Sequence, residues 1–250
     1  MQVTEPSSNA SGGTAELLSH SALMSFGPVN RIHQCLVGLH CYSTDRTRLV
    51  PSVHYCSCGP ESSKFKGFRQ CIIFDSTGPD ARLIGIEYVV PEQVFESLDK
   101  EEKRFWHSHK HEVEGGILQL GTKSLVPQVG EDLAEKGPMT ELHQTYGKTI
   151  HTWAYDKYPD LPLGPPHLMM SLQADDKIAP GLQQTYEEMA GTKIRDKQDF
   201  RQEYLDLSYQ PKPGADSRDG VEFVVASNVG QRTGGPGDLR GVSDQSRPSV

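Results

Sequence analysis

The sequence predicts an α+β fold in which a single, mostly antiparallel sheet is covered by helices. Two β-rich runs, residues 69–75 and 81–90, are separated only by a short Ser-Thr-Gly-Pro-Asp turn, and they therefore predict a hairpin. Two more runs with strand-like alternation, residues 148–156 and 167–173, follow a long stretch with helical patterns. An early hairpin followed by mixed helices and strands is typical of one sheet with helices on its surface.

The segment before the hairpin has a helical pattern. Ile32, Leu36 and Leu39 fall close to the spacing that places side chains on one face of a helix. The sequence therefore predicts an amphipathic helix over residues 28–41, packed against the sheet.

The segment after the hairpin predicts two helices. Pro91 ends the second strand of the hairpin, and residues 91–98 and 99–114 have helical patterns, with acidic residues early in the second segment. The Gly-Gly pair at positions 115–116 ends that helix, and residues 117–121 predict a strand.

The rest of the predicted domain, residues 131–206, also combines helices with strands. Residues 131–146 predict a helix that ends at Gly147, because glycine is the usual residue just beyond a helix C-terminus. The strands at 148–156 and 167–173 are joined by a proline-rich linker, and residues 180–206 predict one or two charged helices.

Both ends of the chain differ from the middle in composition. Residues 1–14 and 208–250 are rich in glycine, serine and other polar residues and cannot bury a core, so we expect disordered tails around one domain, residues 15–207. One short apolar run, Val221–Ala226, interrupts the second tail. It predicts either a strand that docks on the domain or a segment that binds a partner.

Charge and composition narrow the classes of function. The formal net charge of −8 argues against nucleic-acid binding, which requires clustered Lys and Arg. No apolar stretch approaches the ~20 residues that span a bilayer. The chain has 5 cysteines, an odd number, and no secretory signal is evident. We therefore expect a reduced, cytoplasmic protein without a disulfide framework.

The densest group of potential metal ligands lies in FWHSHKHEVE, residues 105–114. On a helix, His107 and His111 share a face, at the spacing by which two imidazoles can hold one ion. On a strand, His107, His109 and His111 would line one face instead. The alternative is a structural role, because histidines near a helix C-terminus cap exposed carbonyls and interact favourably with the helix dipole.

Two more groups contain histidine. His54, Cys56 and Cys58 would share one face of a strand and form a small patch of soft ligands, although Cys-x-Cys alone is a weak zinc signature and small core cysteines are the alternative. His33 and His40 are two turns apart on the predicted helix, or ~10 Å, so they cannot hold one ion by themselves. We expect these two to be hydrogen-bonded, partly buried structural histidines.

Signatures of common catalytic chemistry are missing from the sequence. It contains no Gly-x-Ser-x-Gly elbow, no phosphate-binding loop and no Gly-x-Gly-x-x-Gly fingerprint. Cys71 precedes an apolar strand and is expected to be buried and inert. Hydrolase, kinase and dehydrogenase functions therefore lack their usual sequence basis.

Several runs of residues resemble the oil body-associated protein family and occur in the order found in that family, between about Pro28 and Arg195. The runs are IHQCLVGLHCY (32–42), RQCIIFDS (69–76), ARLIGIEY (81–88), EEKRFWHSHKHEV (101–113), TYGKTIHTW (145–153) and LPLGPPHLMMS (161–171). The resemblance implies a protein without the long hydrophobic hairpin of oleosins, and plant members occur on seed oil bodies. It carries over no catalytic residue.

The resemblance also bears on the candidate ligands. Family members commonly have tyrosine where this chain has His111, which directs attention to His107, His109 and Glu112. If His54 and His151 meet these residues in the fold, a metal site results. The candidate metal ligands are therefore His54, His107, His109, Glu112 and His151, and the ion would be a transition metal such as zinc or iron.

Two functions remain open at this point. The first is a non-enzymatic protein, cytoplasmic and peripheral on lipid droplets, that binds the droplet surface or droplet proteins. The second is a metal-binding protein or metalloenzyme that acts on a small molecule. Convergence of the histidines around one point would favour the second.

Overall fold

The computed structural model describes residues 23–122, 127–217 and 220. The expected N-terminal tail and the apolar run Val221–Ala226 lie outside the described residues. Residues 208–217, the first part of the expected C-terminal tail, lie against the domain. Tyr146 accepts a hydrogen bond from the backbone N–H of Lys212 at 2.7 Å, and Asp216 accepts one from the backbone N–H of Ser108 at 3.0 Å.

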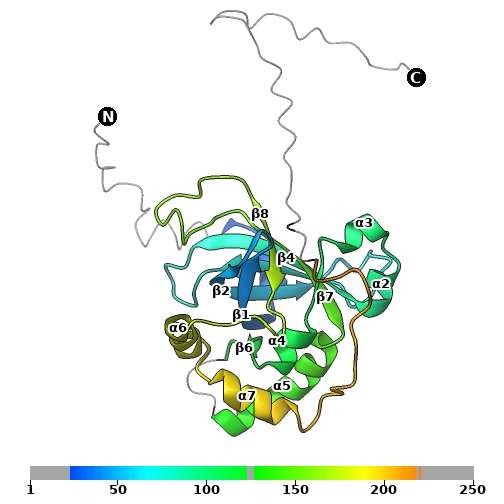
Figure 1. Ribbon diagram of the computed structural model, residues 1–250. Helices are drawn as coiled ribbons and strands as arrows, with labels where there is room; N and C mark the ends of the chain where they lie inside the picture. Colours follow the sequence, from blue (N-terminus) through cyan, green and yellow to red (C-terminus); the bar gives the residue numbers. More distant parts are fainter. Residues whose placement is uncertain (1–22, 123–126, 218–219, 221–250) are drawn as a thin grey trace, which may run out of the picture.

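The strands form one antiparallel sheet that closes on itself (Figure 1). The strands are β1 (Gln34–Tyr42), β2 (Asp45–Cys58), β3 (Arg69–Phe74), β4 (Leu83–Pro91), β5 (His107–Ser108), β6 (Gln119–Leu120), β7 (Thr145–His151) and β8 (His167–Ser171). Pairing runs β1–β2–β3–β4–β7–β8 and returns to β1, while β5 extends the edge of β7 and β6 that of β1.

The α+β composition is confirmed, but the predicted open sheet is wrong, because the six main strands form a closed barrel. Closure depends on β1, which pairs with β2 along one edge and with β8 along the other. The predicted hairpin is confirmed as β3 and β4, and the strands predicted at 148–156 and 167–173 correspond to β7 and β8.

The helix predicted over residues 28–41 is wrong: only a short 3₁₀ turn, Val29–Arg31, precedes strand β1. The reason is that both faces of β1 are buried. Val37 and Leu39 pack outward against α6 (Pro180–Ala190), whereas Leu36 packs into the barrel. A strand buried on both faces loses the alternation of apolar and polar residues by which strands are recognised.

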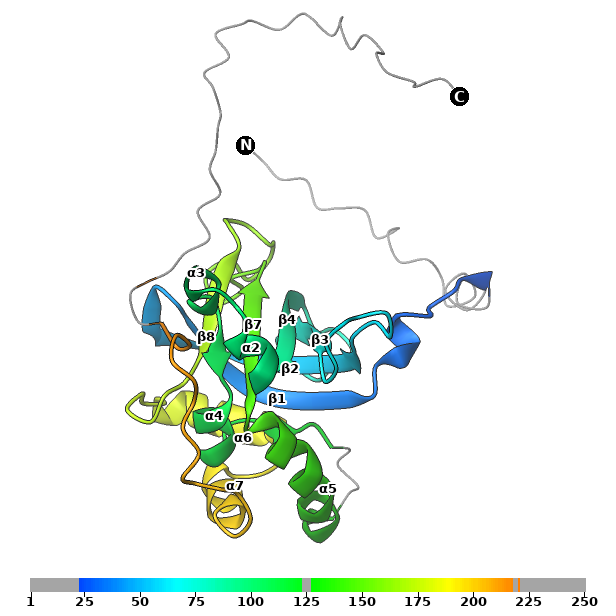
Figure 2. The ribbon, with the colours of Figure 1, turned by 90° about the vertical axis from the view of Figure 1, so that its right-hand side faces the viewer.

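The helices gather mainly at one end of the barrel (Figure 2). They are α2 (Glu92–Glu96), α3 (Lys100–Lys103), α4 (Lys110–Glu114), α5 (Gln128–Leu142), α6 and α7 (Ile194–Arg201). The helix predicted at 99–114 is interrupted by β5, and the one predicted at 131–146 already ends at Leu142. Among the described residues, none of the helices has both the length and the apolar composition required to cross a bilayer.

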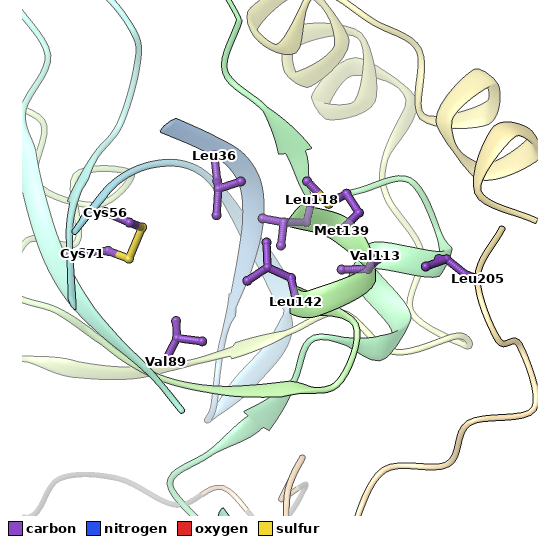
Figure 3. Close-up of a cluster of buried hydrophobic side chains, with 9 residues drawn as sticks. All are labelled: Leu36, Cys56, Cys71, Val89, Val113, Leu118, Met139, Leu142 and Leu205. Atoms are coloured by element: carbon purple, nitrogen blue, oxygen red, sulfur yellow. A yellow bond between two sulfur atoms is a disulfide. The ribbon is translucent and has the colours of Figure 1, made fainter. Parts of the chain in front are cut away.

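Apolar side chains close the barrel at both ends. The larger cluster lies under α4 and α5 (Figure 3) and consists of Leu36, Cys56, Cys71, Val89, Val113, Leu118, Met139, Leu142 and Leu205. The other cluster consists of Tyr42, Val50, Ala154 and Met169. The interior between the two clusters is polar, and it holds the candidate site.

Cys56 and Cys71 face each other across β2 and β3 and form a disulfide. The expectation of a fully reduced chain is therefore wrong. The positions separated by 15 residues meet because the hairpin register places them directly opposite each other.

We expect a Cys56→Ala/Cys71→Ala variant to lose roughly 2–4 kcal/mol of unfolding free energy, because the cross-link restricts the unfolded chain. Urea unfolding measures this loss, and Cys58→Ala, at an exposed free cysteine, is the control. An unfolding midpoint of the wild type that reducing agent leaves unchanged would contradict the expectation.

Candidate metal centre

Ionisable side chains form a belt across the barrel interior, and each of them is at most 5% exposed. The belt consists of His40 (β1), His54 (β2), Glu87 (β4), His107 (β5), His109, Glu112 (α4) and His151 (β7). The structure thus brings together all of the ligands that the sequence singles out, and it adds Glu87 and His40. Polar side chains are enclosed here because inward-facing positions of several strands meet at one level of a closed barrel.

Glu87 lies at the centre of the belt. Its Oε1 is 3.3 Å from His107 Nε2 and 3.5 Å from His109 Nε2, and its Oε2 is 3.4 Å from His54 Nε2. The Thr149 hydroxyl donates a hydrogen bond to Oε1 at 2.8 Å and orients the carboxylate. Burial acts to raise the pKa of Glu87, but the facing histidines outweigh it and hold the pKa well below its ordinary value.

Burial favours the neutral, ligand form of several histidines of the belt. Burial lowers the pKa of His54 and of His109, and it lowers the pKa of His151 to about 3. Burial and then the charge of Glu87 raise the pKa of Glu112 well above its ordinary value. Glu112 is thus held in its protonated form unless a cation lies nearby.

Hydrogen bonding determines which nitrogen of His109 carries the proton. The Thr145 hydroxyl donates its single proton to the Leu142 carbonyl at 2.8 Å, so it accepts from His109 Nδ1 at 2.7 Å. Neutral His109 therefore has a bare Nε2, which faces Glu87 Oε1 at 3.5 Å and Glu112 Oε1 at 3.6 Å. The lone pair of His109 Nε2 and the carboxylate oxygen of Glu87 are directed at one another, and a cation between them would stabilise both.

The donor separations match those of a metal site. Ligands at about 2.1 Å from a tetrahedral ion lie about 3.4 Å from one another, and Glu87 Oε1 lies 3.3 and 3.5 Å from the two histidine nitrogens. The donor atoms of Glu87, His107 and His109 all lie within 4.8 Å of one another. Two imidazoles and one carboxylate are a ligand set typical of zinc and of non-haem iron.

Gly147 provides a second indication of the same site. It pairs with His107 across β5 and β7. A Cβ atom at this position would lie 2.6 Å from His107 Nε2, 2.8 Å from His109 Nε2 and closer still to Glu87 Oε1. A methyl carbon cannot lie so close to three polar atoms, so the absence of a side chain at Gly147 leaves these donors in place beside β7. The types of the donor atoms and their separations fit a bound ion.

Other residues that the sequence offers as ligands lie apart from the belt. His111 is half-buried on α4, so the predicted pair of His107 and His111 does not form. His33 is exposed, and its Nδ1 bonds to the Arg31 carbonyl. The expected patch of His54, Cys56 and Cys58 does not form either, because Cys56 is in the disulfide and Cys58 is exposed.

Glu87 and His40 are not among the predicted ligands, and His40 is expected only as a structural histidine. The sequence does contain a signal for Glu87. It is the one acidic residue in the apolar run LIGIEYVV, residues 83–90. It lies two residues from Gly85 and two from Val89, so the three share one face of the strand. A carboxylate on the inner face of a buried strand requires compensating partners, and such a position indicates a functional site.

Comparison with known proteins places the chain in a family. Residues 26–205 match the family described as "Protein of unknown function (DUF1264)". The chain is 39% identical to Oil body-associated protein 1B of Arabidopsis thaliana over 181 residues, which are 72% of this chain and 70% of that protein. It is 38% identical to Oil body-associated protein 1A of Zea mays over 190 residues, 76% of this chain and 75% of that protein. No solved structure matches the chain. The chain belongs to the oil body-associated protein family.

Proposed function

We propose that the protein binds a divalent transition-metal ion, such as zinc or iron, through Glu87, His107 and His109, with Glu112 as the fourth ligand. The observation that carries this proposal is the set of donor atoms of Glu87, His107 and His109, which lie within 4.8 Å of one another, with Glu87 Oε1 at 3.3 and 3.5 Å from the two histidine nitrogens. Glu112 lies next to His109 Nε2 and would be ionised beside a bound cation. Its carboxylate then completes a set of two nitrogen and two oxygen donors.

The burial of the metal centre limits the size of any molecule with which the ion could react. Every donor is at most 5% exposed, and apolar clusters close the barrel on both sides. Such a centre suits an ion that stabilises the fold or reacts with a small molecule, and it does not suit a macromolecular substrate.

Elemental analysis of the untagged protein tests the proposal. We expect about one ion or more per chain in the wild type and about one ion fewer in a His107→Ala/His109→Ala variant, because two of the nitrogen donors of this centre are then missing. His33→Ala, at an exposed histidine outside the belt, is the matched control and should keep the metal. A folded wild type that contains no metal and takes up neither zinc nor iron would overturn the proposal.

Gly147→Ala should abolish metal binding at this centre while all the ligands remain. The added methyl group would displace the donor atoms of His107, His109 and Glu87 from their positions. Displacing these side chains should also cost about 1–3 kcal/mol of unfolding free energy. Zinc titration of the purified variant measures the first effect, and urea unfolding measures the second.

Gly38→Ala is the matched control for this substitution. The same methyl group at Gly38 meets Ser52 Oγ at 3.6 Å and the His54 ring at 3.7 Å, which are ordinary contacts. This variant should bind zinc as the wild type does. Normal zinc affinity in Gly147→Ala would contradict binding of the ion by Glu87, His107 and His109.

A second function is association with the surface of lipid droplets, favoured by the names of the relatives as oil body-associated proteins. A largely apolar groove beside β4 offers contact with lipid. It is lined by Phe65, Phe68, Tyr88, Val90, Val94, Leu98, Trp106 and other residues. Phe65 is 51% exposed at this groove.

Droplet flotation from lipid-loaded cells tests this second function with a tagged chain. We expect a droplet fraction for the wild type that is reduced in Phe65→Ser. Leu133→Ser is the control, because Leu133 is an exposed apolar residue on α5 and does not line the groove. A wild type without any droplet fraction would exclude the function.

A further inference from the structure

We infer that the barrel holds a second metal ion, bound by His40, His54 and the other oxygen of Glu87, so that Glu87 bridges two ions. This inference rests on the proposed first centre and extends it to a pair. The donor atoms of His40, His54 and Glu87 lie within 4.8 Å of one another, as do those of Glu87, His107 and His109. Glu87 is the only residue that the two sets share.

The geometry of the second set resembles that of the first. His54 Nε2 lies 3.4 Å from Glu87 Oε2 and 3.2 Å from His40 Nε2. Both values are close to the separation of about 3.4 Å expected between ligands of one tetrahedral ion. The two histidines come from β1 and β2, and Glu87 reaches them from β4 across the interior of the barrel.

His151 orients His40 in the way that Thr145 orients His109. His151 Nε2 lies 3.0 Å from His40 Nδ1. Donation of the His40 Nδ1 proton to His151 leaves the lone pair of His40 Nε2 directed at His54 and Glu87. Metal-binding histidines commonly donate their other N–H to a neighbouring acceptor in this manner.

A hydrogen-bond network without an ion explains this arrangement less well. His54 Nε2 faces both His40 Nε2 and Glu87 Oε2. One proton on His54 Nε2 can point well along only one of these directions, and His40 Nε2 has no proton when Nδ1 donates to His151. A single cation between the three atoms satisfies all of their lone pairs.

The shared carboxylate of Glu87 would bridge the two ions. Glu87 Oε1 faces one pair of histidines and Oε2 faces the other. Two-metal sites in proteins hold their ions about 3.5–4 Å apart and activate a water molecule or clamp two reacting oxygens between them. The charges of Glu87 and Glu112 would offset about half of the charge that two divalent ions bring into the interior.

His151 is a positioning residue for the second ion. His151→Ala should weaken binding of the second ion by about 10–100-fold and leave the first unchanged, which is the usual effect of losing a partner of a ligand. His151→Gln offers an amide oxygen that can accept the His40 Nδ1 proton, and it should recover most of the affinity. Stepwise cobalt titration separates the two ions and measures each effect.

The decisive experiment is the stoichiometry of metal-stripped protein titrated with Co²⁺. We expect about two ions per chain for the wild type and for His33→Ala, and about one for His40→Ala and for His54→Ala. With Mn²⁺, electron paramagnetic resonance should show a spin-coupled pair in the wild type and an isolated ion in His54→Ala. The wild-type values need no variant, so misfolding of a variant cannot hide the answer.

The outcomes distinguish the two proposals. Saturation of the wild type at one ion, unchanged in His40→Ala and His54→Ala, would overturn the second ion and leave the first centre intact. Saturation at one ion that His54→Ala removes but His107→Ala/His109→Ala retains would overturn the proposed first centre. Failure to bind any ion would overturn both.

Discussion

Glu87→Gln is expected to abolish the stabilisation of the protein by metal. Glu87 supplies an oxygen to each of the two ligand sets, and glutamine keeps its size but not its charge. A metal present at ~1,000 times its dissociation constant stabilises a folded protein by about 4 kcal/mol. We expect this gain in unfolding free energy for the wild type with Zn²⁺ and none for Glu87→Gln, as measured by urea unfolding with and without the metal.

The metal-free proteins need a separate comparison. Glu87 is only 5% exposed, but the facing histidines hold its pKa well below its ordinary value, so the ionised carboxylate stabilises the fold at neutral pH. Metal-free Glu87→Gln should therefore be less stable than metal-free wild type. Thr149→Val, which removes only the hydrogen bond to Glu87 Oε1, is the control and should weaken binding by about 10–100-fold. Equal stabilisation of Glu87→Gln and wild type by Zn²⁺ would contradict the proposed ligand role.

Glu135→Leu is expected to have the largest effect on stability outside the metal centre. Glu135 on α5 accepts bonds from Arg201 Nε at 3.0 Å and Nη2 at 3.1 Å, and Lys197 Nζ lies 3.0 Å away. Burial acts to raise the pKa of Glu135, but Arg201 and Lys197 lower it below its ordinary value. Arg201 is fully buried, and after the substitution its guanidinium would keep the Val113 carbonyl and the Tyr204 hydroxyl as partners but no carboxylate.

The expected loss is about 3–5 kcal/mol of unfolding free energy, because one partner of a buried ion pair is left without compensation. Glu135→Leu/Arg201→Met should recover most of it, since neither charge then remains. Glu141→Ala is the control. It breaks the ion pair with Arg69 at a side chain that is 57% exposed, and exposed pairs contribute about 0–1 kcal/mol. A loss below about 1 kcal/mol in Glu135→Leu would contradict this account.

Local patterns predict the parts of the fold that depend on neighbouring residues. The β3–β4 hairpin follows from two β-rich runs on either side of a short turn. Helices α6 and α7 fall within the predicted charged segment 180–206. Strand β1 is predicted wrongly because its burial on both faces comes from α6 on one side and the barrel interior on the other. Neither of these contacts is visible in the pattern of β1 itself.

The sequence by itself determined which residue types are available for a metal centre and their short-range spacing, including His107, His109 and Glu112. The tertiary structure alone decided that they meet His54 and His151 around Glu87. The physical reason is that barrel closure and strand register set these distances, and both arise from pairing between segments far apart in the chain. The spacing of residues along one segment carries no information about that pairing.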